Sequence, residues 1–338
     1  MLKSNQAKIL ITLTCISILA LAGGLLLVKN RPDETLLFGR NPDLPTLTFY
    51  TSDLATTPQL PFWSALKKGE LLENCNIRVE LWKNLDDLRG IMLAGKGDLW
   101  LGDTEGFARA QSAGAPVRLL LISGWRKFYL VSRNSKIHGL DDIKGTQLAF
   151  TPPGTPAVSL IRSIQKEDRQ AIIFASHEPR QLALMLLDGR LDTALLPEPL
   201  LSSLIAKDKT IRIVENIEDY YGRKTGGPGR IPLAGIAVNA KTAAAYPHLV
   251  QSILDTLIRE GEKLTMDADA AMEALDALPT MFTGFIPKEM IAASLERDVV
   301  LVKTALDAEK EIRSYLSILM PGFLETLKNR NDFFWEPM

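Results

Sequence analysis

Short strand-like segments alternate with helix-like segments from about residue 47 to residue 238, and this alternation restricts the folds that the chain can adopt. Residues 77–82 alternate apolar and polar positions as a strand does, whereas Leu85, Leu88 and Met92 recur at the spacing of one helix face. Strands that alternate with helices predict mainly parallel sheets covered on both faces. Such sheets bind ligands at the carboxyl ends of their strands.

The expected strands are 47–50, 77–82, 98–101, 117–122, 128–131, 147–150, 171–175, 192–196, 211–214 and 233–238. The expected helices are 58–68, 85–94, one that holds Phe107 and Ala110, 155–165, 179–188 and 198–206. Residues 222–229, which include Gly226-Gly227-Pro228-Gly229, predict a long loop or the neighbour of a hinge. Residues 241–327 are expected to be mostly helical.

The N-terminus predicts export from the cytoplasm. Residues 9–28 carry no charge and follow Lys3 and Lys8. They fit a cleaved signal peptide with Ala20-Leu21-Ala22 as its cleavage site. They also fit an uncleaved membrane anchor, because about 20 apolar residues span a bilayer. The anchor is slightly favoured, since cleavage after Ala22 would leave the apolar residues 23–28 as the new terminus. Residues 31–45 hold three prolines and predict a linker from this 1–30 segment to the folded part.

The ionisable residues and cysteines exclude several classes of protein. The formal net charge of -1 gives no basic excess of the kind that nucleic-acid binding requires. Cys75 is the only cysteine outside the N-terminal apolar run, so neither a disulfide framework nor a Cys-rich metal site is expected. His138, His177 and His248 are scattered along the chain, so no metal and no cofactor are predicted.

Catalytic motifs are not matched. Residues 90–96 fit the letters of a P-loop, but Gly97 stands where Ser or Thr would hold magnesium, and Gly90 falls within a helical pattern. Neither a G-x-S-x-G elbow nor an H-E-x-x-H motif is present. The chain is therefore predicted not to be an enzyme.

A set of phrases between residues 47 and 275 carries a family resemblance. They are Ile-Met-Leu-Ala-Gly-Lys-Gly-Asp at 91–98, an Ala-rich helix, glycine and strand at 108–121, Leu-Asp-Asp-Ile-Lys-Gly at 140–145, Thr-Pro-Pro-Gly-Thr at 151–155, Gly-Arg-Leu-Asp at 189–192, Pro-Glu-Pro at 197–199, and Ala-Gly-Ile-Ala-Val at 234–238 followed by Tyr246-Pro247. With these phrases in this order along its sequence, the chain resembles the nitrate/sulfonate/taurine and pyrimidine-precursor binding proteins of ABC importers.

This resemblance implies a two-lobed type II periplasmic-binding-protein fold of α/β class, with a mostly parallel sheet in each lobe and two crossovers. Lobe 1 is expected at 46–125 plus 232–338, and lobe 2 at 126–231. It also implies a small-molecule ligand held in the cleft between the lobes, and an ABC permease with its ATPase as partners. The protein would then act in the periplasm or on the outer face of the inner membrane, anchored there if residues 1–30 are retained.

Polar residues after the expected strands are the candidate ligand contacts, because a cleft binder needs donors and acceptors from both lobes. They are Ser52, Asp53, Thr57, Asp103, Thr104, Ser123, Trp125, Thr151, Gly154, Thr155 and Glu198. Thr155 opens a helix whose free backbone N–H groups favour an anion, although Pro156 removes one donor. The loops of Ser52 and Thr155 are expected to face each other across the cleft.

Other roles stay open for these residues and for the chain. Ser, Thr and Asp after strands also serve as helix caps, Glu198 included, and Trp125 also suits core packing. Instead of transport, an anchored binding lobe could present its ligand to a receptor as a sensor. Some relatives with this fold are biosynthetic enzymes, but the pyrimidine-forming ones rely on a cysteine-rich motif that this chain lacks. The ligand is expected to be anionic or aromatic and heterocyclic.

Overall fold

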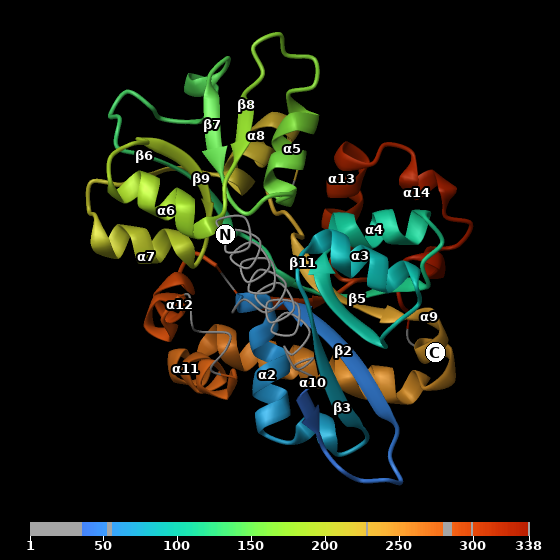
Figure 1. The fold of residues 1–338 in the computed structure, drawn as a ribbon. Coiled ribbons are helices and arrows are strands. Elements are labelled where there is room, and N and C mark those ends of the chain that lie inside the picture. The colour runs from blue at the N-terminus through green and yellow to red at the C-terminus, as the bar shows by residue number, and fades with distance from the viewer. Residues whose placement is uncertain (1–35, 53–55, 228, 280–285, 299, 337–338) are drawn as a thin grey trace, which may run out of the picture. The chain divides into compact units, whose positions relative to one another are not determined.

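Two β-sheets, each flanked by helices, form two lobes in the computed structural model, which describes residues 36–52, 56–227, 229–279, 286–298 and 300–336 (Figure 1). The strands are β1 Leu36–Phe38, β2 Thr46–Ser52, β3 Asn76–Trp82, β4 Leu99–Asp103, β5 Val117–Gly124, β6 Phe128–Ser132, β7 Gln147–Phe150, β8 Ile173–Ser176, β9 Thr193–Pro197, β10 Arg212–Asn216, β11 Ala234–Asn239 and β12 Val300–Thr304.

The helices are η1 Thr57–Gln59, α2 Leu60–Lys67, η2 Glu70–Leu72, α3 Leu85–Leu93, α4 Thr104–Ser112, η3 Leu140–Ile143, α5 Pro156–Ile164, α6 Pro179–Leu187, α7 Leu200–Lys207, α8 Ile217–Thr225, α9 Ala240–Ala245, α10 Pro247–Met266, α11 Ala268–Ala277, α12 Lys288–Ser294, α13 Glu309–Leu319, α14 Phe323–Thr326 and η5 Arg330–Asp332. Asp103 supplies the cap that the sequence predicted for α4, since its carboxylate accepts the Gly106 N–H at 2.7 Å.

The seven-stranded sheet of the first lobe has the order β1-β3-β2-β4-β11-β5-β12. Strand β2 runs parallel to β3 and β4, as βαβ connections require. Strand β11 lies antiparallel between β4 and β5, although more than 100 residues separate it from either. The first lobe is therefore completed by chain that returns from the second.

The five-stranded sheet of the second lobe repeats this plan with the order β10-β6-β9-β7-β8. Strand β7 runs parallel to β8 and β9, and β6 lies antiparallel between β9 and β10. In each sheet the first strand that the chain forms after crossing from the other lobe, β11 or β6, runs antiparallel to both of its neighbours, and in the first sheet β12 is antiparallel to β5 as well. The two crossovers are residues 125–127, between β5 and β6, and residues 226–233, between α8 and β11.

Three parts of the sequence-based prediction were wrong. Residues 217–225 form helix α8, so only the end of the expected 222–229 loop is a connection. Strand β12 interrupts the region 241–327 that was expected to be mostly helical. Residues 36–38, within the predicted linker, add the edge strand β1 to the first sheet.

The apolar core is continuous between the lobes. One cluster of buried side chains includes Trp100 and Leu119 in the first lobe and Leu130 and Leu160 in the second. Tyr315 of α13 belongs to the same cluster, and α13 packs against α5 of the second lobe. A smaller cluster lies under α6 and α7.

Cys75 is fully buried, and burial raises the pKa of its thiol to about 11, as expected for an inert structural thiol.

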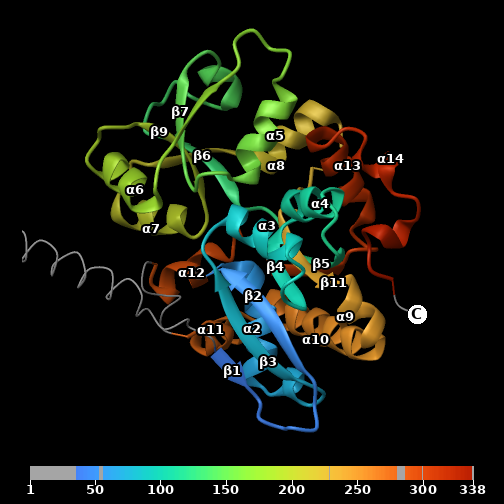
Figure 2. The ribbon, with the colours of Figure 1, turned by 45° about the vertical axis from the view of Figure 1, so that its right-hand side comes forward.

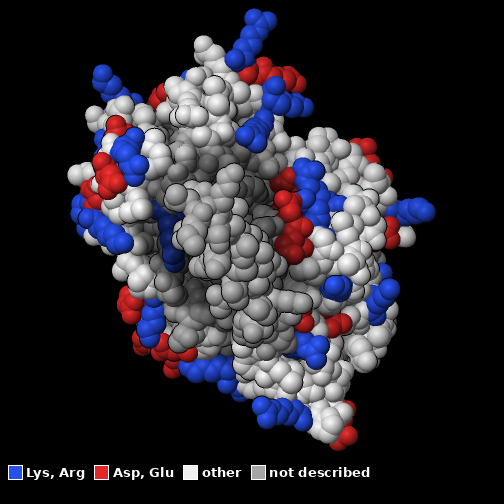
Figure 3. Space-filling model, viewed as in Figure 1, with Lys and Arg blue, Asp and Glu red and all other residues white. Residues whose placement is uncertain are grey.

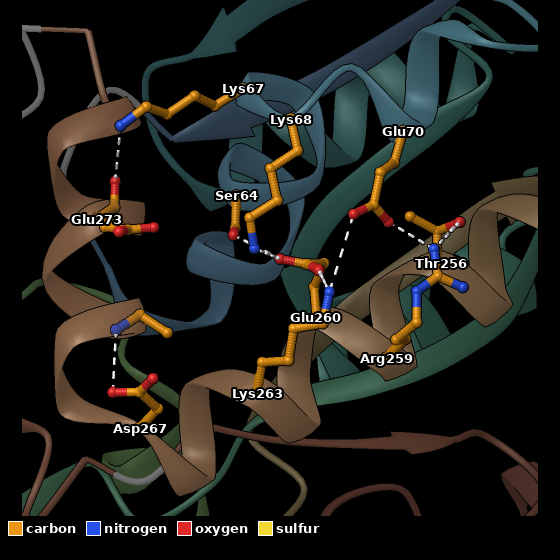
Figure 4. Close-up of polar contacts among 11 residues, drawn as sticks. Ser64, Lys67, Lys68, Glu70, Thr256, Arg259, Glu260, Lys263, Asp267 and Glu273 are labelled. Carbon is orange, nitrogen blue, oxygen red and sulfur yellow. Dashed lines mark hydrogen bonds and ion pairs between the residues drawn. The ribbon is translucent and has the colours of Figure 1, made fainter.

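Hydrogen bonds to the buried carboxylate of Glu260 link α10 to α2 in the first lobe (Figure 4). Glu260 is fully buried and accepts hydrogen bonds from Ser64 Oγ and Lys68 Nζ, both at 2.6 Å, and from Lys263 Nζ at 2.5 Å. Burial by itself would raise the pKa of this carboxyl. The three hydrogen bonds and the lysine charges outweigh burial and lower the pKa to about 2.

Among the described helices, none combines the length and the apolar character that a membrane span requires. The predicted signal peptide or anchor at 1–30 lies outside the described residues, and so do residues 31–35 of the predicted linker. On the face drawn in Figure 3, the described basic and acidic side chains are interspersed.

Candidate functional site

The carboxyl ends of the first-lobe strands bring three of the predicted residues close together. Ser123 Oγ, at the end of β5, donates to the carbonyl oxygen of Pro58 at 3.1 Å, which places it beside Thr57. The amide of Gln59 in η1 donates to the carbonyl oxygen of Ser52 at 3.5 Å. Asp53, which the sequence also predicted in the loop after β2, lies outside the described residues.

Trp125, at the first crossover, is a packing residue in this conformation. Its ring is 2 % exposed, and its indole N–H donates to the carbonyl oxygen of Leu301 at 2.7 Å. The ammonium of Lys303 lies 5.5 Å from the ring centroid, within range of a cation–π contact. The ring therefore joins β12 to the crossover.

Asp103 and Thr104 lie at the second crossover. The Thr104 hydroxyl donates to the carbonyl oxygen of Pro232, and its backbone N–H donates to that of Leu233 at 3.1 Å. Burial raises the pKa of Asp103 to about 6, against the opposing effect of the Gly106 N–H. These residues fix the crossover as well as cap α4.

Glu218 of α8 holds the same crossover from the other lobe. Its carboxylate accepts the backbone N–H of Ile231 at 2.8 Å. Burial raises the pKa of Glu218 to about 7, although this hydrogen bond and the charges of Arg126 and Arg230 act in the opposite direction. Sequence reasoning missed Glu218 because residues 217–225 were not recognised as a complete helix.

Several buried polar atoms have no hydrogen-bond partner among the residues that the structure describes. They include the hydroxyl oxygens of Thr51, Thr57, Thr151, Thr155, Tyr221 and Tyr315 and the amide nitrogen of Asn216. Leaving a buried donor unpaired costs about 1–3 kcal/mol, so native structures rarely tolerate such groups without water or a ligand. Three of these residues, Thr57, Thr151 and Thr155, are ligand contacts that the sequence predicted, and Thr51 lies next to a fourth, Ser52, at the end of β2.

The start of α5 offers fewer backbone donors than expected. The N–H of Thr155 already donates to the carbonyl oxygen of Pro152 at 3.3 Å, and the N–H of Val158 donates to that of Thr155 at 3.1 Å. Gly154 is exposed and has a φ of 75°, a left-handed conformation that favours glycine. The hydroxyls of Thr151 and Thr155 are buried side-chain groups of this loop that have no partner among the described residues.

Glu198 is bound on both carboxylate oxygens. Its Oε2 accepts the backbone N–H of Ser202 at 2.9 Å, so it caps its own helix as one interpretation of the sequence held. Its Oε1 accepts Arg297 Nε at 2.6 Å. Nearby, Lys127 Nζ donates to Oδ2 of the fully buried Asp298 at 3.1 Å.

The described predicted residues thus fall into four groups. Ser52, Thr57, Ser123 and Trp125 gather at the end of β5 and the first crossover. Asp103 and Thr104 hold the second crossover. Thr151, Gly154 and Thr155 share the loop before α5, and Glu198 pairs with Arg297, which sequence reasoning missed. Burial raises the pKa of Asp298, and the charge of Lys127 and the nearby Thr57 hydroxyl oppose that rise, which links Thr57 to this region.

No group of three His, Cys, Asp or Glu side chains among the described residues is arranged to hold a metal ion. An open polar cavity of about 530 Å³ lies elsewhere, between η2 and α10. It is lined by Glu70, Glu73, His248, Gln251, Ser252, Asp255, Thr256 and Arg259, none of which is a predicted site residue. We place the candidate site at the strand ends because Thr151 and Thr155, which the sequence predicted as ligand contacts, have hydroxyls there that are unpaired among the described residues, although Oε1 of Gln251 in this cavity is unpaired as well.

The fold is that of periplasmic binding proteins of ABC transporters. The aliphatic sulphonate-binding protein of Escherichia coli superposes with a TM-score of 0.65 at 16% identity, over 88% of this chain and 94% of that one. The nitrate-binding protein of Synechocystis PCC 6803 gives 0.60 at 13% identity, over 86% and 84%. An ABC transporter protein of Parabacteroides distasonis gives 0.65 at 16% identity, over 87% and 99%.

No family model and no curated protein sequence matches the chain. At these identities the solved structures establish the fold, and with it the type II architecture of two lobes and two crossovers that the sequence predicted. The resemblance noted in the sequence is therefore confirmed at the level of fold.

Proposed function

We propose that the chain is the extracytoplasmic solute-binding component of an ABC-type importer. Lobe 1 (residues 46–125 and 232–338) and lobe 2 (residues 126–231) would close on a small solute and deliver it to a permease with its ATPase. The observation that carries this proposal is the set of orphaned buried hydroxyls at strand ends of both lobes. The fold supports it, since similar solved structures are periplasmic binding proteins.

The chemistry of the orphaned groups favours a solute rich in oxygen. The hydroxyls of Thr151 and Thr155 can donate to a solute. The Thr57 hydroxyl and the Asn216 amide are also donors, but they lie close enough to Asp298 and Tyr129 to oppose the rise that burial causes in the pKa values of those groups. Asp103 and Glu218, with pKa values raised to about 6 and 7, carry less negative charge near neutral pH than ordinary carboxyls do. We therefore propose a small anionic or aromatic, heterocyclic solute, bound without a cofactor or catalysis.

The proposal also requires that the chain is exported from the cytoplasm. The charged start and apolar run of residues 1–30 fit a signal peptide or an anchor, and either one would deliver the two lobes to the periplasmic face of the inner membrane. Solute-binding proteins act on that side of the membrane. The binding role can be tested whether or not the segment is cleaved.

A thermal-shift screen of the purified chain tests the binding role. The library would hold sulfonates, small anions, aromatic acids, amines and pyrimidines. A ligand present at a hundred times its dissociation constant stabilises the folded state by about 2.7 kcal/mol, which raises the melting temperature by several degrees. We expect a hit among the anions or aromatic acids. No shift with any compound of the library would count against solute binding.

Replacing Thr155 with valine separates a ligand contact from a structural role. The hydroxyl has no partner among the described residues, so the isosteric change is expected to leave the stability of the ligand-free protein unchanged or slightly higher. If the hydroxyl contacts the solute, affinity for the solute found in the screen should fall about tenfold, as measured by calorimetry. Ser52→Ala should weaken the same affinity.

Thr242→Val is the matched control. Its hydroxyl is also buried but donates to Asp98 Oδ1 at 2.6 Å, within the first lobe. This variant should lose stability and keep its affinity. Unchanged affinity in both Thr155→Val and Ser52→Ala would contradict the placement of the solute between these loops.

A further inference from the structure

Residues 286–298 belong to the first lobe by their place in the chain, yet they contact the second lobe. Helix α12 packs against α7, and both views of the fold show the two helices next to each other (Figures 1 and 2). Ile286 packs against the small core cluster of the second lobe, which contains Leu200 and Leu204 of α7. The segment thus lies across the junction between the lobes.

The end of the segment adds polar bonds that reach three elements of the second lobe. Arg297 donates from Nε to Glu198 Oε1 at 2.6 Å and from Nη2 to Ser202 Oγ at 2.7 Å. The Tyr129 hydroxyl of β6 donates to the backbone carbonyl oxygen of Arg297 at 2.9 Å. Lys127, at the first crossover, pairs with Asp298.

The same segment is held to the first lobe on both sides. Lys288 of α12 pairs with Asp276 of α11. Immediately beyond the segment, β12 begins at Val300, which pairs with Gly124 at the end of β5 in the seven-stranded sheet. Any movement that separates α7 from the first lobe must therefore break the contacts of Arg297, because the segment is anchored to that lobe.

The ion pair suits reversible release better than permanent attachment. The Glu198 side chain is fully buried, whereas that of Arg297 is 30 % exposed. In separated lobes water would reach both groups, whereas in the joined arrangement the buried Glu198 carboxylate is stabilised by Arg297 and the Ser202 N–H. The pair then contributes a modest preference for the joined arrangement, because Coulomb attraction largely offsets desolvation.

We infer that residues 286–298 form an interlobe clamp, in which Arg297 binds Glu198 and Ser202 and sets how often the lobes separate. The inference rests on the proposed function in one respect: solute exchange would require the clamp to release. The clamp itself is a property of the ligand-free protein, and it can be measured without a ligand.

Distance measurements between two spin labels test the clamp. The labels would be attached to cysteines replacing the exposed residues Gln181 of α6 and Glu273 of α11, in the full chain carrying Cys15→Ser. Cys75 is fully buried and would not be labelled. Double electron–electron resonance then reports the interlobe distance distribution of the parent and of Arg297→Met.

We expect Arg297→Met to raise the ratio of separated to joined molecules by about tenfold or more, because hydrogen bonds between charged groups shift equilibria by that factor. Arg297→Lys should give an intermediate ratio, since lysine keeps the positive charge but lacks the planar guanidinium that bonds Glu198 and Ser202 through two nitrogens. Arg190→Met is the matched control: Arg190 pairs with Asp188 on the surface of the second lobe alone, and its distribution should equal the parent's.

A distance distribution of Arg297→Met equal to that of the parent overturns the clamp. If Arg297→Met does not fold, Ser202→Ala decides, because it removes one of the two bonds and leaves the ion pair. A larger separated fraction supports the clamp, and an unchanged one overturns it. A solute screen without hits would weigh against the proposed function alone, since these distances are measured without solute.

Discussion

Replacing Gly235 with alanine is expected to destabilise the protein by about 3 kcal/mol or more. Gly235 is buried in β11, between β4 and β5, where the pairing with β5 is irregular. A Cβ atom there would lie 2.0 Å from the carbonyl oxygen of Leu121 and 3.1 Å from the Cα of Ile122. Both are backbone atoms, so the strands themselves would have to move apart.

Urea unfolding measures this loss, and Gly90→Ala is the control. Gly90 lies within α3, and a Cβ atom there would meet nothing within 4 Å. Alanine favours a helix interior over glycine by about 1 kcal/mol, so this control should be neutral or slightly more stable. If Gly235→Ala unfolded at the urea concentration of the parent, the close packing of β11 on β5 would be wrong.

Replacing Glu260 with glutamine is expected to lower the free energy of unfolding by roughly 2–3 kcal/mol at pH 7. The estimate follows from the pKa of this fully buried carboxyl, which falls from 4.5 to about 2 on folding. Glutamine keeps the shape and removes the charge that pairs with Lys68 and Lys263. Both lysines are partly exposed and can turn to water, which limits the loss.

The pH dependence of this difference is an independent check. Because folding depresses the pKa of Glu260, its stabilising contribution is fully present above pH 4.5 and is lost as the pH falls toward 2. The gap between the parent and Glu260→Gln should therefore shrink between pH 7 and pH 3 in urea titrations. Glu262→Gln, on the exposed side of the same helix, should change stability little. An equal gap at both pH values would exclude the charge of Glu260 as the cause.

The stabilising network and the candidate site occupy different parts of the molecule. Glu260, Lys68 and Lys263 hold α10 on α2 within the first lobe (Figure 4). The orphaned hydroxyls lie at strand ends and the clamp lies across the junction between the lobes. Variants of the first network should therefore change stability, whereas variants at the strand ends should change affinity and those of the clamp should change lobe separation.

Local signals in the sequence predicted most elements of the fold correctly. Alternating and 3.6-residue periodicities placed the strands and helices, and Pro156 marked the start of α5. The errors have identifiable causes. Gly226-Gly227-Pro228-Gly229 suggested a loop, but Gly226, with a φ of 64°, is the C-terminal cap of α8. At Gly222, within that helix, a Cβ would lie 3.1 Å from the Cα of Gly229, a close contact that favours glycine.

Strand β12 was not predicted from the sequence, for a different reason. It is five residues long and follows a helix-rich region. Its partner β5 lies more than 170 residues earlier in the chain, so no local pattern distinguishes it from a helical segment. Short strands form only when a distant edge supplies their hydrogen bonds.

Periodicity and capping in the sequence by themselves determined the alternation of strands and helices and the strand ends where the polar residues gather, because they are local properties of the chain. The division into two lobes was implied by the family resemblance. Only the tertiary structure decided which of those residues are already paired. Glu198 read equally well as a ligand contact or a cap, and its partner Arg297 stands 99 positions away. Whether a given arginine pairs with a given carboxylate depends on how the two lobes pack against each other. Contacts between segments far apart in the chain produce no local periodicity from which they could be predicted.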